Sequence, residues 1–300
     1  FNWTYDNVPP TMTITSTTSG VSDGSTTNDT TIALTFTSSK ATTDFIVGDI
    51  TVSGGDWSSF NATSSTVYTA TFTPTGSGTA VQQVTTIDVA GNKFTDAVGN
   101  NNTAATQFNW TYDNAPPLVS SFTTTTATGS YKAGQAIVIT ANTNEAVKDT
   151  NNITVTLNNT TNTTVVLTAG ADGATMVGTY TVAAGDNTAS LAVSSFTIGT
   201  VTDLADNAST NTTVPTGANM FSNKTIVIDT TAPTITLNTS SLNFNIGVMQ
   251  VITATSNEAL YFNGSLLASD NKPATNITVT TSSSGTAANL VIVSSTSFTF

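Results

Sequence analysis

One ten-residue sequence occurs twice in this chain and sets the length of its repeating unit. It reads FNWTYDNVPP at Phe1–Pro10 and FNWTYDNAPP at Phe108–Pro117, and a looser copy, TIVIDTTAP, follows at Thr225–Pro233. Aromatic residues alternate with polar ones before the Asp, which is the pattern of a β-strand with one buried face. The prolines lack a backbone donor and favour extended backbone, so each copy predicts a strand that ends in a stiff joint. Successive copies lie 107 and 116 residues apart, which is the size of one β-sandwich domain.

Cutting the chain at these joints predicts two complete domains and two partial ones. Residues 1–9 are expected to form the last strand of a preceding domain plus its linker. Residues 10–116 and 117–232 are expected to form one domain each, and residues 233–300 an incomplete one. An open sandwich leaves strand edges unpaired. We therefore expect the last domain to be completed by further chain or by a strand donated from another copy, such as residues 1–6.

The composition favours an all-β protein and excludes several classes of partner. The chain has 69 Thr and 31 Ser, only six Lys, and no Arg, His or Cys. Thr is β-branched and suits the solvated face of a strand. The net charge of −12 opposes binding to nucleic acid and to anionic membrane surfaces, both of which require clustered basic residues. No apolar run approaches the roughly 20 residues that span a bilayer, and without Cys there is no disulfide framework.

Alternating apolar residues predict seven strands in each complete domain. In the first domain they lie around residues 12–14, 32–36, 50–52, 60, 68–72, 84–89 and 108–112. In the second they lie around residues 119–122, 137–139, 153–157, 165–167, 176–182, 191–193 and 226–228. A loop of the form TD followed by DN or GN precedes the last strand in both, at 95–100 and 202–207. The predicted fold is a tandem of seven-stranded immunoglobulin-like (Ig-like) β-sandwiches joined end to end.

The joints, the TD loops and the phrases YTATFTP (68–74) and TYTVAAGDN (179–187) together resemble a known repeat family. The chain is similar to the bacterial Ig-like repeats of large extracellular adhesins and surface proteins. This resemblance implies a structural region of a long fibre, stalk or adhesin on a cell or virion surface, whose partners are neighbouring repeats of the same chain or other copies in a fibre or surface layer. The alternatives are a spacer array of a carbohydrate-active surface enzyme and a surface-layer or filament subunit.

Catalysis has little support in the sequence. Without His or Cys there is no catalytic triad of the Ser-His or Cys-His kind. Asp96 with Asp88, or Asp203 with Asp206, could form a carboxylate pair, but Asp in such loops more commonly supports turns. We also expect Trp3, Trp57 and Trp110 to pack in cores rather than to stack on sugars. We therefore expect that the protein is not an enzyme.

Fifteen Asn-x-Ser/Thr sequons are candidate glycosylation sites, although the abundance of Thr and Ser would create many of them by chance. They are Asn2, Asn28, Asn61, Asn101, Asn109, Asn152, Asn158, Asn159, Asn162, Asn207, Asn211, Asn223, Asn238, Asn263 and Asn276. Asn109 alternates with the aromatic residues of its strand, and we expect it to face outward.

Acidic residues are expected to gather where one domain joins the next. In a seven-stranded sandwich the second-to-third and sixth-to-seventh strand loops return to the pole at which the linker enters. This brings together Asp113, Glu145, Asp203, Asp206 and Asn207 in the second domain. Oxygen ligands from loops suit a structural Ca²⁺ ion, and ordinary Asp turns are the alternative.

The first domain offers a different set of residues at the same pole. It has Asp6, Asp96 and Asn100, but Lys40 stands where the second domain has Glu145. We expect a weaker cation site there, or an ion pair in its place.

Overall fold

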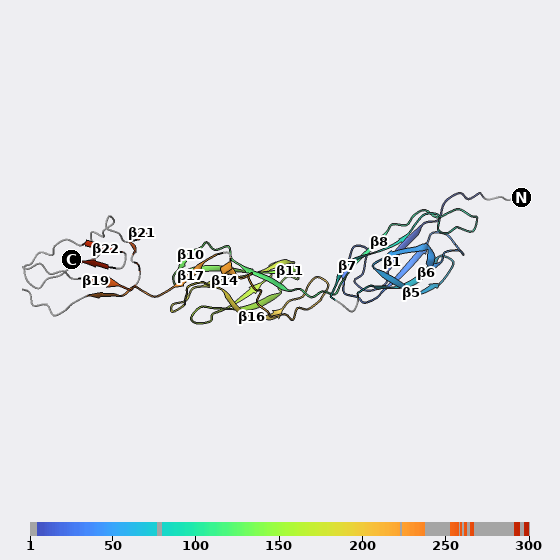
Figure 1. Cartoon of the computed structure of the whole chain (residues 1–300). Helices are drawn as coiled ribbons and strands as arrows, with labels where there is room; N and C mark the ends of the chain where they lie inside the picture. Colours follow the sequence, from blue (N-terminus) through green and yellow to red (C-terminus); the bar gives the residue numbers. More distant parts are fainter. Residues whose placement is uncertain are drawn as a thin grey trace, which may run out of the picture. The chain divides into compact units, whose positions relative to one another are not determined.

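The computed structural model describes residues 5–76, 80–222 and 224–237, and of the remainder residues 253–257, 259, 261–262, 265–266, 291–294 and 297–299 (Figure 1). The described residues form strands, loops and two short 3₁₀ turns, Val47–Asp49 and Met220–Ser222. Their strands build several sheets in which most neighbouring strands are antiparallel, while β2 (Thr26–Thr27) with β8 (Phe108–Asp113) and β10 (Gly129–Tyr131) with β17 (Ile226–Asp229) are parallel pairs. This confirms the predicted all-β sandwich class. Within these residues no helix has the length and apolar character needed to cross a membrane.

Two sheets form the first sandwich, which we define as residues 12–113. One has the order β1-β3-β6-β5, with β1 Met12–Ser16, β3 Ile32–Ser38, β6 Val67–Pro74 and β5 Gly55–Ala62. The other has the order β2-β8-β7-β4, with β2 Thr26–Thr27, β8 Phe108–Asp113, β7 Gln82–Val89 and β4 Ile50–Ser53. Seven of these strands lie where the alternation of apolar residues predicts them, and β3 and β6 bury every second side chain.

Aromatic residues fill the core between these two sheets. Phe36, Phe72 and Trp110 are essentially inaccessible to solvent. Trp110 and Phe72 meet edge to face with ring centroids 6.2 Å apart, and Trp57 packs against Phe72 at 5.5 Å. Such pairs contribute about 0.5–1.5 kcal/mol beyond the area they bury. Trp57 and Trp110 therefore belong to the core, as expected, while Trp3 lies outside the described residues.

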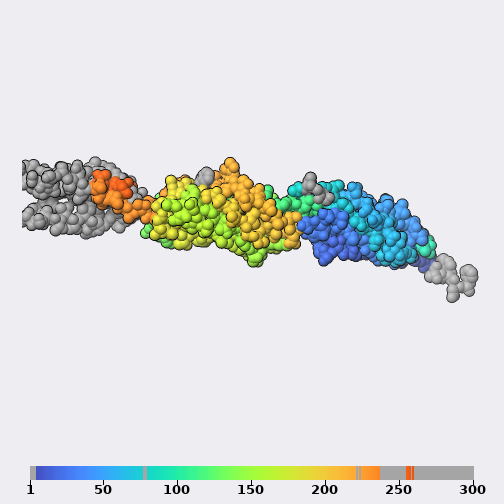
Figure 2. Space-filling model, turned by 90° about the horizontal axis from the view of Figure 1, so that it is seen from below, coloured from blue at the N-terminus to red at the C-terminus, as the bar shows by residue number. Residues whose placement is uncertain are grey.

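The second sandwich, residues 119–229, has its own hydrophobic core but a different sheet arrangement. A six-stranded sheet has the order β16-β12-β13-β14-β11-β9, with β16 Val193–Thr200, β12 Asn152–Leu157, β13 Thr164–Thr168, β14 Gly173–Thr181, β11 Ala136–Val147 and β9 Val119–Thr123. A three-stranded sheet has the order β10-β17-β15, with β10 Gly129–Tyr131, β17 Ile226–Asp229 and β15 Asn187–Thr188. In the space-filling view the first sandwich is coloured blue to cyan and the second green to orange (Figure 2).

By its contacts the chain divides into one unit of residues 1–229, which holds both sandwiches, and a second unit of residues 230–300. In the second unit the described strands β18 Ile235–Leu237, β19 Thr253–Ser256, β23 Ser297–Thr299 and β22 Val291–Ser294 have the order β18-β19-β23-β22. The strands β20 Tyr261–Phe262 and β21 Ser265–Leu266 pair antiparallel. In this sheet, as in β1-β3-β6-β5 of the first sandwich, the first three strands follow the order of the chain and the last strand precedes its neighbour in the sequence.

Candidate functional site at the joints

The residue that follows each joint proline is tied to a residue within or just after a strand further along the chain. In each repeat its N–H donates to a side-chain oxygen of that residue, and its carbonyl accepts the backbone N–H of the same residue. The reciprocal pairs are Thr11 with Ser39, Leu118 with Asn144 and Thr234 with Asn257. Ser39, Asn144 and Asn257 are not among the site residues that the sequence motifs predict. A polar side chain at one fixed position in SSKAT, TNEAV and SNEAL was the available signal.

The linker Asp of each joint caps its own turn. Asp6 Oδ1 accepts the N–H of Val8 at 3.0 Å, and Asp113 Oδ1 accepts the N–H of Ala115 at 3.1 Å. Gln82 of β7 also donates to Asp113 Oδ2 at 2.6 Å. These are Asp turns of the kind that the alternative interpretation predicts. Each turn also holds its carboxylate in one orientation at the joint.

An Asn from the TD loop fastens the linker to the following sandwich. Asn207 Nδ2 donates to the backbone carbonyl of Asp113 and to Asp203 Oδ2, both at 2.8 Å. Asn100 makes the same two bonds in the first sandwich, to the Asp6 carbonyl at 3.1 Å and to Asp96 Oδ2 at 2.9 Å. The two predicted Asn residues therefore act through their amide N–H groups as clasps on the linker.

Replacing Asn207 with Ala should weaken the second sandwich and its joint. The change removes a bond to a buried carboxylate and a bond to the linker carbonyl. Hydrogen bonds to charged groups are worth about 1.5–3 kcal/mol each, so we expect a loss of about 2 kcal/mol in the free energy of unfolding. Urea unfolding measures it, with Asn211→Ala, a change in an exposed loop residue, as the matched control. Equal stability of the two variants would contradict the clasp.

Three carboxylates converge at the joint between the two sandwiches. Asp113, Glu145 and Asp203, here called the acidic triad, each offer an oxygen, and these oxygens lie within 4.8 Å of one another. Asp113 and Asp203 are 2% and 1% exposed, and Glu145 is half-buried. Ligands of one Ca²⁺ ion at about 2.3–2.6 Å are at most about 5 Å apart. The triad has the spacing and the chemistry of a hard-cation site.

Glu145 is under electrostatic strain beside the other two carboxylates of the triad. Burial, followed by the negative charges of Asp113 and Asp203, raises the pKa of the Glu145 carboxyl above its ordinary value. The nearest lysine in sequence, Lys148, does not relieve it, because its ammonium pairs with Asp206 instead. A like-charged group held among carboxylates is stabilised either by a proton or by a bound cation.

The raised pKa of Glu145 predicts a pH effect on the metal-free protein. A carboxyl whose pKa is higher in the folded state than in the unfolded state opposes folding once it ionises, so its penalty disappears as the pH falls below its unfolded value. In chelator, wild type should gain stability relative to Glu145→Gln as the pH falls from 7 towards 4.5. Parallel melting curves of the two proteins over this range would contradict the assignment.

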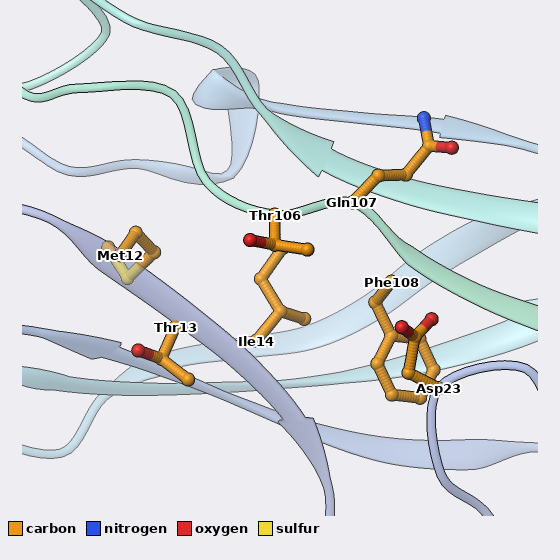
Figure 3. Close-up of a pocket in the computed structure, with 7 residues that line it drawn as sticks. All are labelled: Met12, Thr13, Ile14, Asp23, Thr106, Gln107 and Phe108. Atoms are coloured by element: carbon orange, nitrogen blue, oxygen red, sulfur yellow. The ribbon is translucent and has the colours of Figure 1, made fainter.

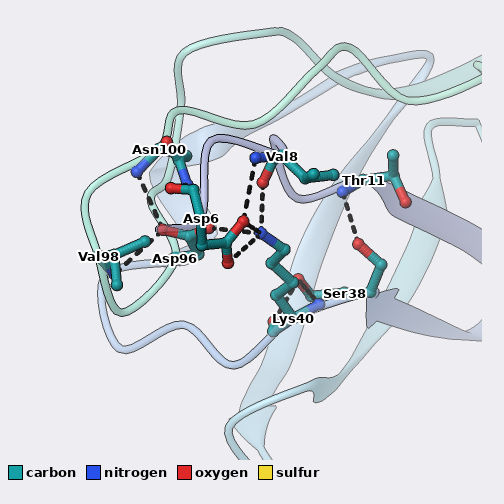
Figure 4. Close-up of polar contacts among 9 residues, drawn as sticks. Asp6, Val8, Thr11, Ser38, Lys40, Asp96, Val98 and Asn100 are labelled. Carbon is teal, nitrogen blue, oxygen red and sulfur yellow. Dashed lines mark hydrogen bonds and ion pairs between the residues drawn. The ribbon is translucent and has the colours of Figure 1, made fainter. Parts of the chain in front are cut away.

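In the first sandwich Lys40 occupies the place of Glu145 and supplies the missing positive charge (Figure 4). Its Nζ lies 2.7 Å from Asp6 Oδ2 and 3.0 Å from Asp96 Oδ2, and it also donates to the carbonyl of Val8. The hydrogen bond to Asp6 raises the pKa of Lys40, and the same bond lowers the pKa of Asp6. Of the two outcomes expected from the sequence, the structure shows the ion pair.

Asp96 is held ionised by its own loop. Burial alone would raise the pKa of its carboxyl, but hydrogen bonds from the Asn100 side chain and backbone, and then from Lys40, place it well below the usual range. The N–H groups of Val98 and Asn100 donate to Asp96 Oδ1 at 3.1 and 2.9 Å. Asp203 accepts the corresponding pair from Ala205 and Asn207, both at 2.8 Å. The loops of the two sandwiches therefore share one scaffold.

Asp206 does not join the triad, which corrects one sequence-based prediction. Its side chain is 74% exposed and pairs with Lys148. Asp206 occupies the loop position that Gly99 fills in the first sandwich, and both have positive φ, +70° and +91°. That left-handed backbone turns the side chain outward, whereas the strand and turn positions of Asp113, Glu145 and Asp203 face the joint.

The structure sorts the candidate glycosylation sites by access. Asn159 is 2% exposed, and its amide N–H groups donate to Thr163 and to the Tyr180 hydroxyl, so the prediction of an accessible sequon is wrong there. Asn207 is engaged in its clasp. Asn109 and Asn152 are half-buried. The exposed members are Asn28, Asn61, Asn101, Asn158, Asn162 and Asn211, while Asn2, Asn223, Asn238, Asn263 and Asn276 lie outside the described residues.

Comparison with known families agrees with this geometry. Residues 6–112 match a family model described as Bacterial Ig-like domain. The match begins at the linker Asp6 and ends on β8, so the first joint and the first sandwich form one bacterial Ig-like domain. The resemblance inferred from the sequence is confirmed for this segment. Bacterial Ig-like domains of this family are typical of surface and extracellular proteins. No curated protein matches the chain.

Proposed function

We propose that this region is a non-catalytic structural part of a long extracellular fibre, stalk or adhesin on a cell or virion surface, built from tandem Ig-like sandwiches. The observation that supports the proposal is the set of hydrogen bonds that hold the linker. At both joints the linker is fastened to the sandwich that follows it by an Asn clasp and by a reciprocal pair of hydrogen bonds. A linker whose polar groups are bonded in this way resists bending, unlike a flexible Gly/Ser tether.

The same proposal assigns a structural Ca²⁺ ion to the acidic triad. Lys40 supports this assignment, because the first sandwich holds an ammonium group between the carboxylates of Asp6 and Asp96 on the same loop scaffold. Where Glu145 replaces the lysine, a divalent cation bound by Asp113, Glu145 and Asp203 supplies the balancing charge. Such an ion joins a residue of β8 to β11 and to the TD loop of the second sandwich, and stiffens the joint.

Distance measurements between spin labels test the stiffness. The chain has no Cys, so labels can be placed at single engineered sites, for example Ser58→Cys on β5 and Thr164→Cys on β13, both exposed. In Ca²⁺ we expect one narrow distance distribution, and in Asn207→Ala with chelator a broad one. A broad distance distribution for the wild-type chain in Ca²⁺ would contradict the proposal of a rigid fibre.

A further inference from the structure

A small pocket opens on the side of the first sandwich, where its two sheets separate (Figure 3). It lies between β1 and the segment that leads into β8, and its volume is about 110 Å³. Met12, Ile14 and Phe108 give it an apolar lining, and the Asp23 carboxylate lies at its edge. Sites for small organic ligands usually measure about 300–1,000 Å³. This pocket has the capacity for one aliphatic side chain.

The edge of β1 beside the pocket presents backbone groups. Ser39 N–H donates to Thr11 O and Thr17 N–H to Ala33 O, which shows that the odd-numbered residues of this segment bond towards β3. In an antiparallel ladder the backbone groups of successive residues point alternately to the two sides of the strand. The N–H and C=O groups of Met12 and Ile14 therefore point away from β3, along the pocket. In the described part of the chain, the bond from Thr103 N to Pro10 O is the last that ties this edge to the segment before β8.

The second sandwich closes the corresponding edge with its own chain. There the N–H of Phe122 on β9 donates to Ala218 O at 2.9 Å, and the neighbouring Met220 is 1% exposed. Asn219 fastens this segment to both backbone groups of Val193, and Lys224 donates to Thr126 O. The closing segment belongs to a longer loop, since 26 positions separate Asp203 from Asp229 but only 17 separate Asp96 from Asp113.

We propose that the β1 edge of the first sandwich is a docking site for an extended segment of a partner protein, with the chemistry of the segment that closes the second sandwich. The partner strand bonds to the backbone of Met12 and Ile14, which is the β-addition mode of peptide recognition. Its aliphatic side chain enters the pocket as Met220 enters the second core. A lysine on the segment faces Asp23, in agreement with the acidic character of the chain.

A synthetic peptide of residues 214–225 (VPTGANMFSNKT) labelled with a fluorophore provides the probe for this site. Titration with the 300-residue chain should show saturable binding with a dissociation constant of about 0.1 mM, because one short strand and one side chain are buried. Thr106→Leu, which fills the pocket, should weaken binding at least tenfold, as should Met→Asp at position 220 of the peptide. Thr15→Ala, an exposed change on the same strand outside the pocket, should bind as wild type does.

Two results would overturn the proposal. The first is a titration in which the peptide does not bind saturably to the wild-type chain, or binds the wild-type chain and Thr106→Leu with equal affinity. The second is a dimer of the chain alone in sedimentation that Thr106→Leu abolishes, because a second copy would then occupy the edge. Equal melting temperatures of Thr106→Leu and wild type establish that the variant folds.

Discussion

Removal of Ca²⁺ should lower the melting temperature of the second sandwich in the wild-type chain by about 10 °C and leave a Glu145→Lys variant unchanged. A ligand that binds only the folded state at 100 times its dissociation constant adds about 2.7 kcal/mol to stability. For a domain of about 100 residues, 1 kcal/mol corresponds to roughly 4 °C or more. Calorimetry in 1 mM CaCl₂ and in EDTA measures the difference.

The Glu145→Lys variant should be insensitive because it copies the first sandwich. Lys40 already shows that an ammonium group at this position reaches two carboxylates on the shared loop scaffold. Glu145→Gln is the control, since it removes one ligand charge without adding a cation, and it should retain a reduced response to Ca²⁺. An equal shift for wild type and Glu145→Lys would show that the metal acts elsewhere.

The reverse change, Lys40→Glu, should destabilise the first sandwich and make it respond to Ca²⁺. It replaces the ammonium between Asp6 and Asp96 with a third carboxylate, and like charges this close oppose folding. We expect a fall of about 5 °C or more in the melting temperature of this sandwich in EDTA, given the size dependence of such shifts. Addition of CaCl₂ should restore most of the loss.

Lys93→Glu makes the same change in charge at an exposed residue of the first sandwich and serves as the matched control. It should alter the melting temperature little in either condition, because isolated surface charges contribute little to stability. If Lys40→Glu behaves like Lys93→Glu, the ion pair has no structural role. If Lys40→Glu is unstable both with and without Ca²⁺, the loop scaffold alone does not create a cation site.

Most of the fold could be predicted from the sequence because the chain is built of strands with regular alternation. Ile32, Leu34 and Phe36 are buried on β3, as their spacing indicates. The convergence of Asp113 with Glu145 and Asp203 also followed from strand parity, which fixes the pole to which each loop returns. Both inferences depend on residue spacing and strand direction, and neither requires knowledge of a side-chain conformation.

The predictions that failed depended on local backbone geometry or on packing between distant segments. The outward direction of Asp206 follows from its positive φ, which the residue type does not reveal. Burial of Asn159 results from its contact with Tyr180, 21 positions further along the chain. The closure of the second sandwich by residues 217–220 likewise rests on long-range contacts with Phe122 and Val193, and its sequence resembles an ordinary loop.

Calorimetric titration of the metal-free chain with CaCl₂ tests the central claim most directly. The account predicts a bound ion at the acidic triad, seen as a binding isotherm that is lost in Glu145→Lys and weakened in Asp203→Asn. It also predicts an additional binding event in Lys40→Glu. An isotherm that Glu145→Lys leaves unaltered, or no heat of binding for the wild-type chain up to millimolar Ca²⁺, would contradict a cation-locked joint.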